Sequence, residues 1–328
     1  MALRNYLVGE VTEDFADGLL TRREALRRLT LLGLSVGSAT ALLAACGDGG
    51  GQSGAAGATS PAAASTPTQG GTGSANPGQP VRFAGPAGEL QGAWAAATDP
   101  KGAILVIHEN RGLTPHFFDL VGRFAKESYS ALCVDLLSAQ GGTASLKDPA
   151  AAPTTLANTP PEHLVADLKA GIDELEHRVP DAKIGVVGFC FGGGMTWNLL
   201  QAGEQRLAAA VPFYGPAPEN PDFRQAKAAV YAIYGEQDER VNATRDRAEA
   251  ALKAAGLTYE IRTFPGAGHA FFNDTGLGTT RRRPRRPGPR CWTGWASICH
   301  EAGSPELLAT GSDYSAANDP GTISPAGS

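Results

Sequence analysis

The sequence contains little cysteine, little histidine and little net charge. Its 328 residues include five cysteines and six histidines, and the formal net charge is −5. No cysteines form a C-x-x-C pair, and no cysteine–histidine cluster has the spacing of metal ligands, so we expect neither a metal nor another cofactor. The mild acidity gives no reason to expect a nucleic-acid partner. A chain of this length can still bury one substantial core or two small ones.

The first 46 residues combine a basic stretch with an uncharged run. TRREALRR (21–28) contains the pair Arg22-Arg23, and 29–45 carries no charged residue. These are the parts of an export signal, and the arginine pair favours the twin-arginine route. LAAC (43–46) resembles a bacterial lipobox, in which Cys46 is lipidated and becomes the new N-terminus. The alternative is a plain transmembrane anchor. Both interpretations predict an exported protein that is tethered to a membrane.

Charge is almost absent from 47–80 as well. The segment consists mainly of Gly, Ser, Ala, Thr, Pro and Gln, and Asp48 is its only charged residue. Such a composition buries too little apolar surface to offset the entropy of ordering. We therefore predict a flexible linker between the membrane and a folded domain.

Strand-like and helix-like patterns alternate through 81–274. Continuous apolar runs predict strands, and apolar residues every three or four positions predict helices. The predicted strands are 102–109, 130–137, 183–189, 207–215, 228–235 and 258–266, and the helices are 116–128, 161–178, one from about 193, and about 243–255. This alternation predicts an α/β domain with a doubly wound, mostly parallel sheet. Its active site should lie at the carboxyl ends of the strands.

The segment Gly188-Phe189-Cys190-Phe191-Gly192 joins a predicted strand to a predicted helix. It has the spacing of a nucleophile elbow, with cysteine in place of serine. The nucleophile of such a turn sits on a strained backbone, so its close neighbours must lack side chains. The following helix directs its amides at the site, which favours a thiolate and a developing oxyanion. Cys190 is therefore the predicted nucleophile. The alternative is a small buried cysteine in a packing turn.

A nucleophile of this kind needs a base, and the base needs an orienting acid. His269, in PGAGHAFF, and Asp238, in YGEQDERV, each follow a predicted strand. The chain order Cys190, Asp238, His269 is that of α/β hydrolases. Glu236 and Asp135 are weaker alternatives for the acid.

The other histidines and cysteines are not predicted to take part in the reaction. His108 ends a strand and could line the site, whereas His163 and His177 lie on the solvated face of a helix. Cys133 lies within a strand and is expected in the core. A disulfide between Cys291 and Cys299 is possible in an oxidising compartment.

Four segments together resemble the dienelactone hydrolase family (carboxymethylenebutenolidases) of the α/β-hydrolase fold. They are HENRGL (108–113), VVGFCFGGG (186–194), YGEQDERV (234–241) and FPGAGHAFFND (264–274). The resemblance implies that Cys190 is the nucleophile, His269 the base and Asp238 the acid.

The resemblance also implies roles that spacing alone does not suggest. Glu109 would contact the resting cysteine and help to form the thiolate, and the amides of Phe191 and Asn110 would form the oxyanion hole. The family's substrates carry a carboxylate, for which Arg111 is the one cation near the site that the sequence suggests. The alternative for Glu109 is a strand-end carboxylate paired with Arg111.

The character of the chain changes after residue 274. TTRRRPRRPGPR (279–290) is rich in arginine and proline, and the rest of 275–328 shows no sustained pattern. Family members usually continue into a long amphipathic helix, which proline excludes over 284–289. We expect an irregular basic tail produced by a shift of reading frame. The alternative is a tail that binds anionic lipid or polymer.

These patterns predict a hydrolase of lactones or carboxylic esters that acts through a thioester on Cys190. Its partners would be a small-molecule substrate and a membrane. One alternative is a non-catalytic or crippled α/β domain that serves as a surface binding lipoprotein. Another is a thiol redox protein, although no resolving cysteine lies near Cys190 in sequence.

Overall fold

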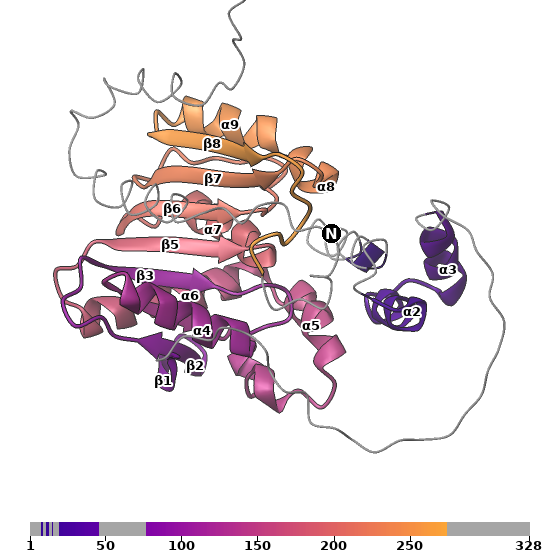
Figure 1. The fold of residues 1–328 in the computed structure, drawn as a ribbon, viewed down its shortest axis with the longest axis horizontal. Coiled ribbons are helices and arrows are strands. Elements are labelled where there is room, and N and C mark those ends of the chain that lie inside the picture. Colours follow the sequence, from indigo (N-terminus) through magenta and orange to yellow (C-terminus); the bar gives the residue numbers. More distant parts are fainter. Residues whose placement is uncertain (1–7, 9–10, 13–14, 16–19, 46–76, 274–328) are drawn as a thin grey trace, which may run out of the picture.

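The computed structural model describes residues 8, 11–12, 15, 20–45 and 77–273 (Figure 1). Cys46, most of the predicted linker, and the predicted tail lie outside these residues. The pair Cys291 and Cys299 lies outside them as well.

An eight-stranded sheet forms the centre of the molecule, with helices packed against it (Figure 1). The strand order is β1-β2-β4-β3-β5-β6-β7-β8. Only β2 pairs in antiparallel fashion, with β1 and β4, and every other pair is parallel. The strands are β1 Gln79–Gly85, β2 Gly88–Ala95, β3 Gly102–Ile107, β4 Tyr129–Val134, β5 Ile184–Phe189, β6 Leu207–Phe213, β7 Ala229–Gly235 and β8 Tyr259–Phe264. The predicted α/β fold with a mostly parallel sheet is confirmed.

Burial explains why the central strands are continuous apolar runs. Every residue of β3, β4 and β5 is buried, as expected for strands covered on both faces. The edge strand β8 instead alternates between exposed and partly buried residues. The apolar core therefore lies along the middle of the sheet.

The helices of the domain connect these strands. They are α4 Pro115–Lys126, α5 Ala152–Asn158, α6 Pro161–Arg178, α7 Phe191–Gln201, α8 Glu239–Asn242 and α9 Arg245–Ala254, with short 3-10 turns between β4 and α5. The boundaries of α6 match its prediction, since Pro161 begins the helix. α7 begins two residues before its predicted start, directly after Cys190.

Some elements differ from the predictions. β1, β2 and α5 are not among the predicted elements, because none of them is a continuous apolar run or a long amphipathic helix. β1 begins at Gln79, inside the segment predicted as linker. β4 ends at Val134 rather than at 137, because the Asp135 carboxylate accepts hydrogen bonds from the amides of Leu137 and Thr143 and turns the chain.

Two short helices lie within 20–45 of the predicted export signal. α2 spans Arg22–Leu31 and α3 spans Val36–Ala45, and the break between them contains Gly33 at φ 82°. Arg27 of α2 forms an ion pair with Asp148, at 2.5 Å. Among the described residues, no helix has the length and apolar character needed to cross a membrane.

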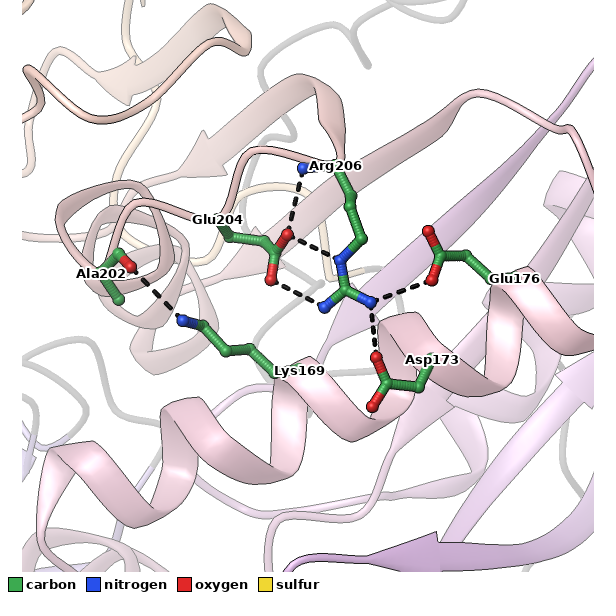
Figure 2. A network of polar contacts seen from close by, with 6 residues as sticks. All are labelled: Lys169, Asp173, Glu176, Ala202, Glu204 and Arg206. Atoms are coloured by element: carbon green, nitrogen blue, oxygen red, sulfur yellow. Dashed lines mark hydrogen bonds and ion pairs between the residues drawn. The ribbon is translucent and has the colours of Figure 1, made fainter.

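An ion-pair network joins α6 to the turn between α7 and β6 (Figure 2). The Arg206 guanidinium pairs with Glu204 at 2.8 Å, Asp173 at 2.5 Å and Glu176 at 2.9 Å. Hydrogen bonds from Arg206 hold the pKa of the Glu204 carboxyl below its usual value, and these carboxylates raise the pKa of Arg206. Because Arg206 directly precedes β6, the network lies at the amino end of that strand, away from the predicted site.

Candidate active site

The predicted site residues follow the ends of four parallel strands. Glu109 follows β3, Cys190 follows β5, Asp238 follows β7, and His269 follows β8. Because parallel strands end at the same edge of a sheet, these residues share one edge. The sheet order therefore places the predicted site where the sequence patterns expect it.

Cys190 sits on the strained turn that a nucleophile elbow requires. Its φ of 56° and ψ of −115° are uncommon for a residue other than glycine. Its amide donates to the Phe213 carbonyl at 3.0 Å, and its own carbonyl accepts from Gly194 at 3.1 Å. The residue is 3% exposed and directly precedes the first residue of α7. The strain is consistent with a thiol held at a fixed position over the helix N-terminus.

The glycines of the elbow are required by close backbone contacts. A Cβ at Gly188 would lie 2.0 Å from the Gly192 carbonyl oxygen, and a Cβ at Gly192 would lie 2.3 Å from the Ile107 carbonyl oxygen. Both distances are far below van der Waals contact. The turn thus packs directly onto the end of β3, which brings Cys190 close to the loop that carries Glu109.

Asp238 and His269 form a buried hydrogen-bonded pair. Nδ1 of His269 lies 2.6 Å from Oδ2 of Asp238, and the two side chains are 8% and 0% exposed. The other oxygen, Oδ1, accepts from the Val241 amide at 3.2 Å. An ionised carboxylate only accepts hydrogen bonds, so Nδ1 carries the proton and Nε2 is the nitrogen able to accept another.

The weaker acid candidates have other partners. Glu236 accepts from the Gly266 amide at 2.7 Å and braces the loop that leads to His269. Asp135 accepts from Leu137 and Thr143 in the turn after β4. Of the three carboxylates considered, Asp238 is the one in contact with the histidine.

Glu109 is held by two groups that are absent from the sequence predictions. Asn273 donates from Nδ2 to Oε2 at 2.8 Å, and the Tyr214 hydroxyl donates to Oε1 at 3.4 Å. Two signals in the sequence could have identified these partners. Asn273 lies in the same motif as His269, and Tyr214 lies near the end of the predicted strand that becomes β6. Arg111, predicted as a substrate contact, is exposed.

His108 is a structural residue rather than a lining residue. It is 0% exposed, its Nδ1–H donates to the Glu109 carbonyl at 2.8 Å, and its Nε2 accepts from the Leu136 amide at 3.1 Å. Burial lowers the pKa of His108, which matches a neutral ring with one donor and one acceptor. Complete burial therefore corrects the expectation that His108 lines the site, and the ring instead orients the loop of Glu109.

An aromatic ring packs against His269, and further rings pack next to it. The Tyr214 ring lies 5.3 Å from the His269 ring and 5.4 Å from that of Phe271. Phe272 stacks on Phe189 at 5.2 Å. Rings at these distances exclude water, which strengthens the electrostatic interactions within the site.

The remaining predicted positions are compatible with their proposed places. Phe191 is the first residue of α7, and Asn110 directly follows Glu109; both are buried. Cys133 is fully buried in β4, as predicted, and burial raises the pKa of its thiol well above the usual value. Within the part of the chain that the structure describes, no group of three His, Cys, Asp or Glu side chains could hold a metal ion.

Comparison with known proteins gives a consistent result. The model of the dienelactone hydrolase family matches residues 90–283. A protein of Methylorubrum extorquens, provisionally named a carboxymethylenebutenolidase, is 33% identical over 196 residues, which cover 56% of this chain and 67% of that protein. A relative from Escherichia coli K12 with the same provisional name is 29% identical over 188 residues, which cover 53% of this chain and 69% of the relative.

Solved structures show the same architecture. The crystal structure of a provisionally named dienelactone hydrolase from Klebsiella pneumoniae superposes with a TM-score of 0.55 at 25% identity, and covers 69% of this chain and 98% of that chain. A dienelactone hydrolase-like promiscuous phosphotriesterase from metagenomic libraries superposes with a TM-score of 0.57 at 20% identity, and covers 69% of this chain and 96% of that chain. The latter supports the fold alone.

Proposed function

The chain belongs to the dienelactone hydrolase family, and we propose that it cleaves lactones or carboxylic esters with the Cys190 thiolate as its nucleophile. The observation that carries the proposal is the buried pair of Asp238 and His269, at the same sheet edge as the strained Cys190. A hydrolase that forms a covalent acyl-enzyme uses a nucleophile, a base and an orienting acid in this arrangement.

The first half of the reaction forms a thioester. The Cys190 thiolate attacks the carbonyl carbon, and the C=O double bond becomes a tetrahedral oxyanion. The amides of Phe191 and Asn110 are the proposed donors to that oxyanion. When the intermediate collapses, the C–O bond to the alcohol breaks. Nε2 of His269 then gives the leaving oxygen the proton that left the Cys190 thiol, which Glu109 accepts first and passes on to His269. In a lactone this oxygen remains attached to the acyl group.

The second half returns the enzyme to its starting state. Nε2 of His269 takes a proton from a water molecule, whose oxygen attacks the thioester carbon. The resulting tetrahedral intermediate expels the Cys190 thiolate and releases the acid. The proton on Nε2 of His269 then returns to the thiolate, which restores the resting thiol. Asp238 keeps Nδ1 protonated throughout, so that Nε2 is always the nitrogen that exchanges protons.

Glu109 is the proposed gate for the thiol. Its half-buried carboxylate accepts hydrogen bonds from two neutral donors, Asn273 and Tyr214. Glu109 itself lies in the loop after β3, and the cysteine elbow packs against the start of this loop. A carboxylate held without covalent or metal restraint can reorient when substrate enters, and it can then accept the thiol proton. This proposal keeps Cys190 protonated at rest, when oxidation would otherwise threaten it.

The test is turnover of a panel of lactones and activated aryl esters by the full chain. Cys190→Ala is expected to abolish turnover, whereas the control Cys133→Ala removes the buried thiol of β4 and should keep it. Mass spectrometry of a rapidly quenched reaction should show an acyl group on the peptide containing Cys190. Turnover that survives in Cys190→Ala would contradict the mechanism. A folded wild-type protein without turnover would favour the non-catalytic alternative.

We also propose that the N-terminal segment exports this domain and tethers it to a membrane. The support is the sequence pattern of 1–46, with its arginine pair and the lipobox-like LAAC. Replacement of Arg22 and Arg23 by lysine should block export, and Cys46→Ala should release the exported protein from the membrane fraction. Retention of the Cys46→Ala variant in that fraction would instead favour a transmembrane anchor.

A further inference from the structure

Three buried donor atoms around the start of α9 have no hydrogen-bond partner among the described residues. They are the Tyr234 hydroxyl, Nε of Arg245 and Nε of Arg247. Buried donors are rarely left unpaired, because each one forgoes its hydrogen bonds to water at a cost of about 1–3 kcal/mol. A group of three at one place therefore calls for an acceptor.

The Tyr234 hydroxyl is the most deeply buried of the three. Tyr234 lies on β7 and is 1% exposed. Burial raises the pKa of its hydroxyl, so the group keeps its proton and acts as a donor at neutral pH.

Arg245 approaches Tyr234 from the side of β8. Tyr234 is paired with Thr263 in the register of β7 and β8, and paired residues of parallel strands project from the same face. Arg245 donates from Nη1 to the Thr263 hydroxyl at 3.2 Å. Its guanidinium therefore lies on the face from which the Tyr234 side chain projects.

Arg247 approaches from the side of β6. It donates from Nη2 to the Ala217 carbonyl at 2.9 Å, and the Ala217 amide donates to the Thr244 hydroxyl at 3.0 Å. These contacts fix the loop after β6 against the start of α9. Both guanidinium groups are close enough to lower the pKa of the Tyr234 hydroxyl, although burial outweighs them.

The two half-buried arginines have no carboxylate partner among the described residues. Their hydrogen bonds go to neutral oxygens. Asp238 and Glu249, the acidic groups that act electrostatically on Tyr234, are directed to His269 and to the Tyr259 hydroxyl respectively. Two positive charges and a hydroxyl donor thus gather next to the positive end of the α9 dipole, where no negative charge from the described part of the chain is in contact.

We propose that Arg245, Arg247 and Tyr234 form a binding site for a small oxyanion, a phosphate or carboxylate group. The site does not include Cys190, which follows β5, because its residues belong to β7 and to the first turn of α9. Two donor-only cations select an anion over a cation, and the oxygens of phosphate or carboxylate can accept from several N–H and O–H groups at once. The bound anion would fasten α9 to the ends of β6, β7 and β8.

The experiment is thermal unfolding of the full chain in inorganic phosphate and in sodium chloride of matched ionic strength. Phosphate at about tenfold its Kd should raise Tm by roughly 3–5 °C beyond chloride, from mass action and the usual dependence of Tm on stability. The double variant Arg245→Gln/Arg247→Gln should lose this difference. Tyr234→Phe should reduce it, and Lys253→Gln, which removes a cation from the last turn of α9, should retain it.

A second measurement separates the possible outcomes. Calorimetric titration of the wild-type protein should give one phosphate per chain, and acetate in place of phosphate distinguishes a carboxylate site from a phosphate site. The proposal is wrong if titration shows no phosphate or acetate binding. It is also wrong if phosphate raises the Tm of the double variant as much as that of the wild type, since general exclusion of phosphate from the protein surface would explain that result. Because titration uses the wild type, a misfolded variant does not leave the proposal untested.

Discussion

Replacement of Asp238 by asparagine should disable the histidine while leaving its position almost unchanged. The Val241 amide already donates to Oδ1 of Asp238, at 3.2 Å, so the asparagine must direct its oxygen there. Its NH₂ group then faces Nδ1 of His269, which lies 2.6 Å from the present carboxylate oxygen. A donor facing Nδ1 forces the ring into the tautomer that carries its proton on Nε2. That nitrogen can no longer accept a proton from water.

The expected loss is large because the substitution reverses the roles of both ring nitrogens. An asparagine in place of the acid of a serine-protease triad lowers kcat by about 10⁴-fold, and a cysteine nucleophile, which ionises more readily, should lose about 10³-fold. This corresponds to about 4 kcal/mol of transition-state stabilisation. The assay is kcat/KM for an activated aryl ester, with Tm measured alongside to show that the variant is folded.

The matched control is Glu236→Gln, in the same loop. Its oxygen can still accept from the Gly266 amide, so the His269 loop keeps its brace and activity should change little. Retention of more than a tenth of the activity by Asp238→Asn would refute the tautomer argument. An equal loss in Glu236→Gln would attribute the effect to the loop rather than to the acid.

Three further predictions concern the supporting structure. Gly192→Ala should lower Tm by several degrees, because the new Cβ would lie 2.3 Å from the carbonyl oxygen of Ile107, the last residue of β3. An unchanged Tm would contradict this close contact. Arg206→Met should lower the free energy of unfolding at pH 7 by about 1 kcal/mol, since the network is partly exposed. The folded state lowers the pKa of the Glu204 carboxyl. The difference in unfolding free energy between the variant and the wild type should therefore disappear as pH falls from the unfolded-state pKa of Glu204 through its folded-state pKa. Denaturant titrations at several pH values would measure it. Asn273→Asp should place two carboxylates in contact at Glu109, so Tm should fall at neutral pH and recover in acid, whereas Asn273→Gln should show no such pH dependence.

The pattern of the central strands was sufficient to predict them, and the reason is burial on both faces. β3, β4 and β5 are continuous apolar runs because helices cover them, and a run of that kind is visible without knowing its neighbours. β1 and β2 could not be predicted in this way. Each is stabilised by its antiparallel partner and has too few buried residues to form a recognisable pattern.

The residues of the site also differ in how far local sequence could predict them. The elbow around Cys190 is local: its glycines, the strand before it and the helix after it are adjacent in the chain, so they could be recognised together. Sequence order also suggested His269 and Asp238 as partners. It favoured Asp238 over Glu236 although both follow the same strand, and the structure shows that Asp238 is the one in contact with His269.

By itself, then, the sequence determined the parallel α/β architecture and the cysteine elbow, because both depend on residues that are close along the chain. The tertiary structure alone decided which side chains meet across long separations. It placed Asp238 rather than Glu236 against His269, Asn273 and Tyr214 against Glu109, and beside Tyr234 two arginines that have no carboxylate partner within the described part of the chain. Such contacts depend on strand order and on the directions of side chains at the sheet edge, and no local pattern of residues encodes either.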